Sequence, residues 1–428
     1  MQRVVALIVL LIFASISIAD AEELIKKGET LPLQRCIEIS ALRQPNVRAA
    51  TSSVDSSRSR VGQSQSNYYP QINLSSGYSR ISPVSPDTAV SGSSSSFDQY
   101  TSSLWLNQNI YDFGKTSSEV QIQKLNLDSS VSDLENVSQQ TIYNVKLAYY
   151  GVIQAKHNRI VAEDTVKSTT LHLEQAKGFF EVGIRPKFDV TRAEVDLSNA
   201  RLNLIRAENA FRIAVATLNN AMGVPEAPDY EIDDNLYFEK YEMTFEDAID
   251  NAYGNRPDLA SLVSKRQASE KSIDLAKTGY YPALSGNAAY NWGGEKFPLD
   301  DGWNVGVALS FPLFSGFLTT HQVAESRANL NVLTANEEFL KQSIYLEVQQ
   351  AYLTLRAAEE AIPTAKLVVD QARENLDIAN GRYLAGVGNP IEVTDAEVSL
   401  VNARTSYIQA LYADKVAQAS LEKAMGVK

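Results

Sequence analysis

Apolar residues recur at every seventh position over long stretches of the chain. Between 187 and 222, one series is Val190, Leu197, Leu204, Phe211 and Leu218, and its companion is Ala193, Ala200, Ala207, Ala214 and Ala221. Alanine repeats in the same way from Ala396 to Ala424. A strict seven-residue repeat predicts helices that supercoil with a left-handed twist, and alanine lets their backbones lie close together. The pattern therefore predicts tightly paired helices in which these positions determine shape.

Two stretches are long enough to form very long single helices. Residues 115–178 contain one glycine before their end and no proline, whereas residues 319–380 contain Pro363, where we expect a kink. A helix over 115–178 would be on the order of 95 Å long. A shorter helix precedes each long one and another follows it, over 187–222 and 390–425. Placed end to end, the short helices match the long one, which predicts long antiparallel hairpins.

Between the helices the pattern changes to a two-residue alternation. Large apolar residues alternate with small or polar ones at Trp303, Val305, Val307, Leu309 and Phe311, and more weakly in an earlier segment. We expect four strands, within about 70–112 and 282–314. Aromatic residues mark their ends: Tyr78, Tyr100, Tyr111, Tyr290, Trp303 and Phe314. Strands of about ten residues between aromatic belts suit a bilayer, although alternation alone also fits a half-buried strand pair in a soluble domain.

Four strands are too few for a closed membrane barrel, because the smallest such barrels have about eight. An open edge in lipid would leave backbone groups unpaired, at a cost of several kcal/mol each. The chain must therefore assemble with copies of itself if the strands cross a membrane. Two copies would supply eight strands and three would supply twelve.

The chain is a duplicated unit. Tyr68-Tyr69-Pro70 recurs 212 positions later as Tyr280-Tyr281-Pro282, and Phe180-x-x-Gly183 recurs 203 positions later as Tyr383-x-x-Gly386. The change of spacing falls between Tyr78 and Tyr100, in a Ser- and Pro-rich stretch typical of an external loop. We therefore divide the chain into a first repeat at 33–224, an acidic linker at 225–244, and a second repeat at 245–427.

Composition and the first residues narrow the function. Arg3, an apolar run over 4–13 and Ala19-Asp20-Ala21 predict a signal peptide at 1–21. A net charge of −12 argues against nucleic acid as a partner. Cys36 is the sole cysteine, so the chain has no internal disulfide. The three histidines are scattered and no catalytic arrangement stands out, so we expect no enzyme, no metal and no cofactor.

In order and spacing, these features resemble the TolC family of outer-membrane efflux proteins over nearly the whole chain. The likeness includes Tyr-Pro before each strand pair, and Tyr111-Asp112-Phe113-Gly114 and Phe314-Ser315-Gly316 after it. It implies a mixed α/β membrane protein that forms a homotrimer, with a twelve-stranded β-barrel, a tunnel of coiled-coil helical hairpins, and a belt at its equator that includes 225–244. It places the chain in the outer membrane of a Gram-negative bacterium, extending into the periplasm.

The resemblance also implies a function, that of a passive exit duct. A periplasmic adaptor protein and an inner-membrane transporter of the RND or ABC type would deliver small toxic compounds or whole proteins to it. The runner-up interpretation is a structural or adhesive coiled-coil stalk in the periplasm or on the cell surface, with no channel.

The two turns between long and short helices are candidate docking sites. They contain Val182, Gly183 and Ile184 in the first repeat and Gly386, Val387 and Gly388 in the second. Glycine permits such a sharp reversal, and a plain helix–turn–helix link would explain these residues. The resemblance implies that these periplasmic tips also meet the adaptor.

Acidic residues follow both turns, at Asp189 in the first repeat and at Glu392 and Asp395 in the second. Glu392 and Asp395 share a helix face, so a trimer would stack two rings of carboxylates that favour cations. The resemblance implies a gate here, although acids in a first helical turn also suit the helix dipole. The family's gate-locking arginine would fall at Gly388. Arg185 and Arg192 are the candidates to replace it, with Tyr383 as the aromatic partner.

Overall fold

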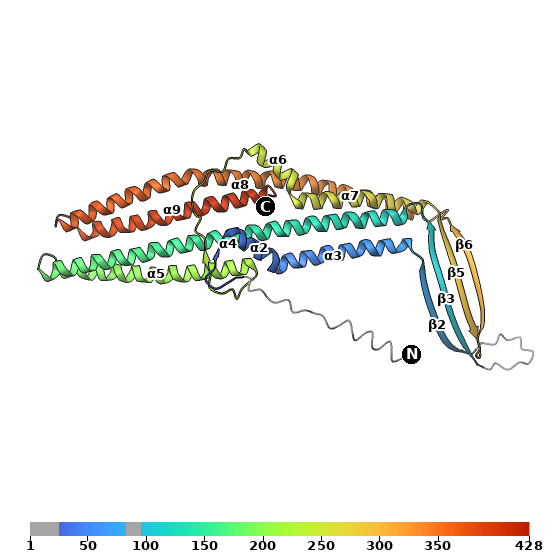
Figure 1. Ribbon diagram of the computed structural model, residues 1–428. Helices are drawn as coiled ribbons and strands as arrows, with labels where there is room; N and C mark the ends of the chain where they lie inside the picture. The colour runs from blue at the N-terminus through green and yellow to red at the C-terminus, as the bar shows by residue number, and fades with distance from the viewer. Residues whose placement is uncertain (1–24, 83–95, 428) are drawn as a thin grey trace, which may run out of the picture.

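The structure, a computed structural model, describes residues 25–82 and 96–427. The predicted signal peptide and most of the loop predicted between Tyr78 and Tyr100 lie outside these residues. Long helices run side by side along the molecule, and a four-stranded sheet extends from one end of them (Figure 1). The predicted combination of long helical hairpins and four strands is confirmed for one chain.

The helices of the two repeats correspond one to one. The first repeat contains α2 (Leu33–Arg43), α3 (Pro45–Gln65), α4 (Lys115–Glu181) and α5 (Lys187–Met222). The second contains α6 (Phe245–Asn255), α7 (Pro257–Lys277), α8 (Leu318–Leu384) and α9 (Pro390–Ala424). The long helices α4 and α8 have 67 residues each, slightly more than predicted, and α8 continues through Pro363. Helices α2 and α6 had no counterpart among the predicted elements.

The helices form a curved layer with a constant order. Toward the tips α4 packs against α5 and α9, and α9 packs against α8 (Figure 1). Toward the sheet α4 packs against α3 and α7, and α7 packs against α8. The seven-residue series supplies the contacts, since Ala193 and Leu197 are buried with Val190 in one hairpin, and Ala396 and Leu400 with Val393 in the other. The layer leaves α8 at one edge, and α3 and α5 at the other.

In the described residues, the sheet is antiparallel throughout. Its strands are β2 (Gln71–Ile81), β3 (Phe97–Tyr111), β5 (Ala283–Gly294) and β6 (Asp300–Ser310), in that spatial order. The register places Leu74 opposite Leu104, Leu104 opposite Tyr290, and Tyr290 opposite Trp303. Since opposed residues share a face, these apolar positions lie on one side of the sheet, whereas Trp105, opposite Asn73 and Ala289, lies on the other.

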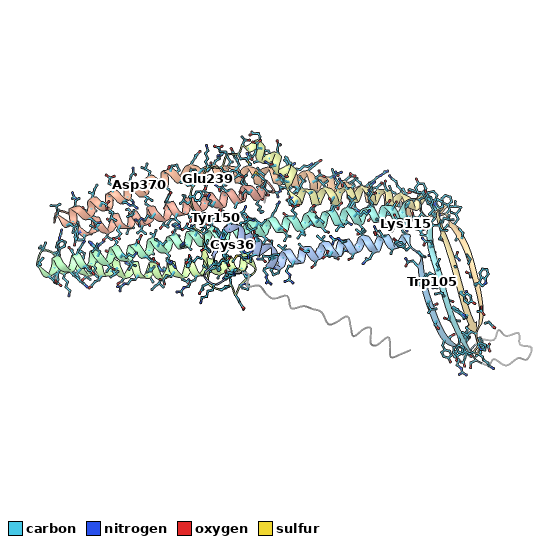
Figure 2. All side chains as sticks on the ribbon, viewed as in Figure 1. Cys36, Trp105, Lys115, Tyr150, Glu239 and Asp370 are labelled. Carbon is cyan, nitrogen blue, oxygen red and sulfur yellow. The ribbon has the colours of Figure 1, made fainter. Side chains whose placement is uncertain are left out.

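The linker crosses the middle of the helical layer. There β4 (Glu231–Ile232) pairs in parallel with β1 (Thr30–Leu31). The fully buried Tyr149 donates a hydrogen bond from its hydroxyl to the carbonyl of Asp233 at 2.8 Å. Arg356 Nη2 donates to the carbonyl of Met243 at 2.8 Å. The buried Cys36 lies at the same level (Figure 2). Backbone contacts of the linker thus join it to both long helices.

No helix in the described part of the chain combines the length and the apolar character needed to cross a membrane.

Candidate functional site at the helical tips

The two turns at the ends of the hairpins have the same backbone geometry. Helix α4 ends at Glu181 and α5 begins at Lys187, while α8 ends at Leu384 and α9 begins at Pro390. Gly183 has φ +75° and Gly386 has φ +77°, a conformation that other L-residues rarely adopt. The equivalent glycines of the two repeats therefore build the same reversal twice, at the end of the molecule farthest from the sheet (Figure 1).

Large apolar side chains are exposed on both tips. In the first turn Val182 and Ile184 are 68% and 64% exposed, and in the second Val387 is 70% exposed. Phe188 and Leu384 are also exposed beside them. Exposed apolar patches that polar residues surround often mark interaction sites. The predicted docking residues Gly183 and Gly386 shape this patch, whereas Gly388 is buried.

Tyr383 joins the two hairpins just above the turns. It is only 1% exposed, and its ring lies 5.1 Å from His172 of α4, 5.7 Å from Phe179 of α4, and 5.2 Å from the Arg185 guanidinium, each measured to the ring centre. Burial, together with the charge of Asp189, raises the pKa of the Tyr383 hydroxyl, which stays neutral. The predicted aromatic partner is therefore the centre of the contact between hairpins.

Arg185 forms the polar link between the turns. Its Nη2 donates a 2.9 Å hydrogen bond to the carbonyl of Gly388, which is the equivalent position in the other repeat, 203 residues away. A Cβ atom at Gly388 would lie 2.7 Å from the backbone nitrogen of Tyr383. A side chain therefore cannot fit at Gly388 without a shift of the backbone. This explains why the arginine is absent there and why one from the first repeat reaches across.

The acidic residues occupy different environments. Glu392 is exposed on α9 and pairs with Arg382 Nε at 3.3 Å, and Asp395 is exposed one turn further along. Asp189 is 6% exposed, and its Oδ2 has no hydrogen-bond partner. Asp189 therefore lies against the Tyr383 contact, whereas Glu392 and Asp395 face outward. Arg192 is half-buried, and its Nε is unpartnered.

Sequence reasoning missed several members of this site. His172 is only one of three scattered histidines in the sequence. Nor does the sequence indicate the pairing of Arg382 with Glu392 or the hydrogen bond from the Thr394 hydroxyl to Asp196 Oδ2 at 3.1 Å. The sequence does contain one indication of these polar contacts, because Thr169 and His172 lie on the buried side of α4. Polar residues on an otherwise apolar seam indicate contacts that hydrophobic periodicity does not reveal.

At the opposite end, aromatic rings gather at both ends of the strands. Near the loops, Tyr100 contacts Tyr78 and Phe297 with ring centres 5.2 and 5.0 Å apart. Near the helices, Phe113 contacts Tyr111 and Tyr281 at 4.7 and 5.7 Å. The predicted belt residues Tyr290, Trp303 and Phe314 are at least partly exposed.

The two faces of the sheet differ in polarity. On the apolar face, Trp303 and Leu309 are 74% and 68% exposed. On the other face, Ser103 donates to Asn291 at 2.7 Å. An exposed apolar face between two aromatic belts suits lipid, and a polar opposite face suits water.

Comparisons with known proteins agree with this geometry. The model of the outer membrane efflux protein family matches residues 37–224 and 248–427. The chain is 23% identical over 416 residues to the outer membrane protein TolC of Escherichia coli, covering 92% of this chain and 82% of TolC. It is 24% identical over 400 residues to the protein CyaE of Bordetella pertussis, covering 90% and 81%.

Solved structures share the fold. A crystal structure of CusC matches with a TM-score of 0.80 at 17% identity, covering 92% of both chains. The CmeC outer membrane channel of Campylobacter jejuni matches with a TM-score of 0.80 at 17% identity, covering 92% of this chain and 85% of CmeC. Because the family model covers both repeats, the chain belongs to the outer membrane efflux protein family and is an outer-membrane exit duct for efflux or secretion.

Proposed function

We propose that three copies of the chain close side by side into one continuous tube, with a twelve-stranded barrel in the outer membrane and a helical tunnel in the periplasm. The observation that carries this proposal is the pair of open sheet edges, on β2 and β6. Backbone groups on these edges have no partner within the sheet, and lipid offers none. If the copies pair β6 with β2 of the next chain, all of these backbone groups are hydrogen-bonded only when the copies form a closed ring.

The duplication supports a specific register for this pairing. Within one chain, β3 pairs with β5, and Leu104 lies opposite Tyr290. Strand β6 is the repeat equivalent of β3, and β2 is the equivalent of β5. The corresponding pair between copies is therefore Val307 of one chain opposite Tyr78 of the next. Both residues belong to the apolar face, so the face continues across the seam.

The same argument extends to the helices. Within the chain α4 packs against α7, so α8 of one copy would pack against α3 of the next. Helix α8, at the edge of the layer, exposes Phe339 at 71% and Val332 at 57%. Apolar side chains exposed along a layer edge are the surface that such packing would bury.

We propose that the tips are both docking site and gate. The apolar patch around Val182, Ile184 and Val387 would meet a periplasmic adaptor, through which an inner-membrane pump of the RND or ABC type supplies the cargo. Glu392 and Asp395 would form rings of carboxylates at the tunnel end, where they favour cations. Arg185 and Tyr383 would hold the two hairpins together in the closed state. The duct itself contributes no energy source.

Single-channel recording in planar bilayers tests this function. The purified protein should form pores that prefer cations, and replacing both acids (Glu392→Ala with Asp395→Ala) should raise the conductance and reduce the cation preference, because charge at the narrowest point controls passage. A protein that forms no pore would contradict the duct. Pores with unchanged conductance and selectivity in the double variant would contradict the gate alone.

A further inference from the structure

A cavity with a mixed lining of polar and apolar residues lies between the two hairpins above the Tyr383 contact. It has a volume of about 240 Å³ and is lined from α4, α5 and α9. Its polar lining includes His172, Asp196, Asn199, Asn203, Glu397 and Asn402. The share of liquid volume that one water occupies is about 30 Å³, so the space suits a molecule of several heavy atoms.

Two carboxylates face this cavity from opposite hairpins, Asp196 from α5 and Glu397 from α9. Neither forms an ion pair with a lysine or arginine of the described residues. Asp196 Oδ2 accepts a hydrogen bond from the Thr394 hydroxyl at 3.1 Å. Burial, and then the proximity of Asp196, raise the pKa of Glu397, which a hydrogen bond from Ser168 only partly offsets. The two acids of this cavity therefore have no cationic partner among the described residues.

His172 adds an unpartnered ring nitrogen to the same wall. It lines the cavity, is 9% exposed, and its Nδ1 has no hydrogen-bond partner. Burial lowers the pKa of this imidazole, so it is neutral near pH 7 and has one nitrogen that accepts. A buried polar atom without a hydrogen-bond partner costs about 1–3 kcal/mol, and a bound molecule that pairs with this nitrogen would remove that cost.

We propose that this cavity binds a small aliphatic diamine, whose two ammonium groups pair with Asp196 and Glu397 and so bridge the hairpins. Ammonium groups are donors only, and they match a lining of carboxylates, amide oxygens and an imidazole nitrogen. A metal ion fits less well, because the described residues contain no group of three or more His, Cys, Asp or Glu side chains placed to hold one. A bridged pair of hairpins would keep the tip closed; this consequence rests on the proposed function.

Isothermal titration calorimetry with 1,4-diaminobutane tests the site on the detergent-solubilised full-length protein at pH 7.5. One saturable site per chain is expected, with binding weakened at least tenfold in Glu397→Gln and in Asp196→Asn, and more than tenfold weaker binding of the monoamine butylamine. The matched control is Glu194→Gln, an exposed acid on the same helix as Asp196, which should bind as the parent protein does. Hydrogen exchange should slow over 165–172 and 394–402 when the diamine is bound.

Absence of saturable binding would overturn the proposal, as would equal binding in Glu397→Gln and Asp196→Asn. Equal loss of binding in Glu194→Gln would assign the diamine to exposed acids in general and overturn the cavity site. Should a carboxylate variant not fold, His172→Asn provides the same comparison with the charges intact and a weaker expected effect of about threefold. None of these results bears on pore formation without the diamine, so the exit duct is tested separately.

Discussion

At the scale of single residues, the contact between the two turns depends on one glycine and one arginine that occupy equivalent positions of the two repeats. Gly388 leaves room for the chain to turn, and Arg185 uses that room to reach its carbonyl. The sequence alone shows that an arginine is missing from Gly388 and that Arg185 and Arg192 are nearby. Only the spacing of the hairpins in three dimensions shows that Arg185 makes the contact.

Replacing Arg185 should weaken the closed tip. Arg185→Ala removes a hydrogen bond from a charged donor and a cation–π contact with Tyr383, together about 2 kcal/mol. The fraction of time that single channels spend open should therefore rise. Arg185→Lys should have a smaller effect, since lysine retains the charge but not the planar stacking group. Arg206→Ala, at an exposed position of α5, is the control; an equal rise in both alanine variants would exclude a specific role for Arg185.

A methyl group at Gly388 should disrupt the second turn. In Gly388→Ala the Cβ would lie 2.7 Å from the Tyr383 nitrogen, so the backbone must shift, at a cost of about 1–3 kcal/mol. Hydrogen exchange of peptides covering 382–390 should become faster. Gly381→Ala is the matched control, because no atom lies within 4 Å of its Cβ position and it is inside a helix, where alanine is favoured. Equal exchange in the two variants would contradict the steric argument.

At the scale of elements, hydrophobic periodicity was sufficient to predict the long helices and the four strands. Their signal is strong because one face of each element is apolar over many residues. Helices α2 and α6 were missed because Pro45 and Pro257 stand at the first position of the next helix, where proline is tolerated. The sequence before such a proline therefore does not show whether a separate short helix ends there. The linker was also incompletely predicted, since hydrogen bonds rather than apolar side chains determine its path.

The equatorial packing of α9 should depend on pH through Asp414. This side chain is fully buried, Gln418 donates to its Oδ2 at 3.1 Å, and its Oδ1 has no partner. Burial, assisted by Glu359 and opposed by Lys415, raises the pKa of Asp414 from 3.8 to about 6. The folded state thus holds the proton more tightly than the unfolded chain. The free energy of unfolding should therefore fall as the pH rises from about 4 to 6, and it should stay lower above that range.

Asp414→Asn should remove this dependence. It should leave stability near pH 4 almost unchanged and increase it at pH 8, by about 2–3 kcal/mol, since one pKa unit corresponds to about 1.4 kcal/mol. Thermal unfolding in detergent at both pH values measures the difference. Asp370→Asn, at an exposed position of α8 (Figure 2), should change stability by less than about 0.5 kcal/mol at either pH. If Asp414→Asn were less stable than the parent protein at pH 8, the ionised carboxylate would be stabilised by its contacts, which would contradict a cost of burying its charge.

At the scale of the whole molecule, one physical requirement links the parts. A chain with two repeats supplies four strands and a layer of helices, and both end in unpaired edges. The duplication indicates how these edges pair between copies. The edge strands β6 and β2 are the repeat equivalents of β3 and β5, which already pair within one chain. Sequence reasoning reached the need for assembly through the number of strands. It could not reach the register at the seam, which follows only from the pairing of β3 with β5.

Cysteine cross-linking across the seam tests the closed ring most directly. The natural Cys36 can stay in place, because it is buried and burial raises its pKa to about 12, which makes it unreactive. A variant with Tyr78→Cys and Val307→Cys should form disulfides between chains in the outer membrane, and the largest product should contain three chains. Tyr78→Cys with Trp303→Cys, on the same face but shifted by four residues, is the control. Products limited to two chains, or equal cross-linking of both variants, would contradict the proposed ring.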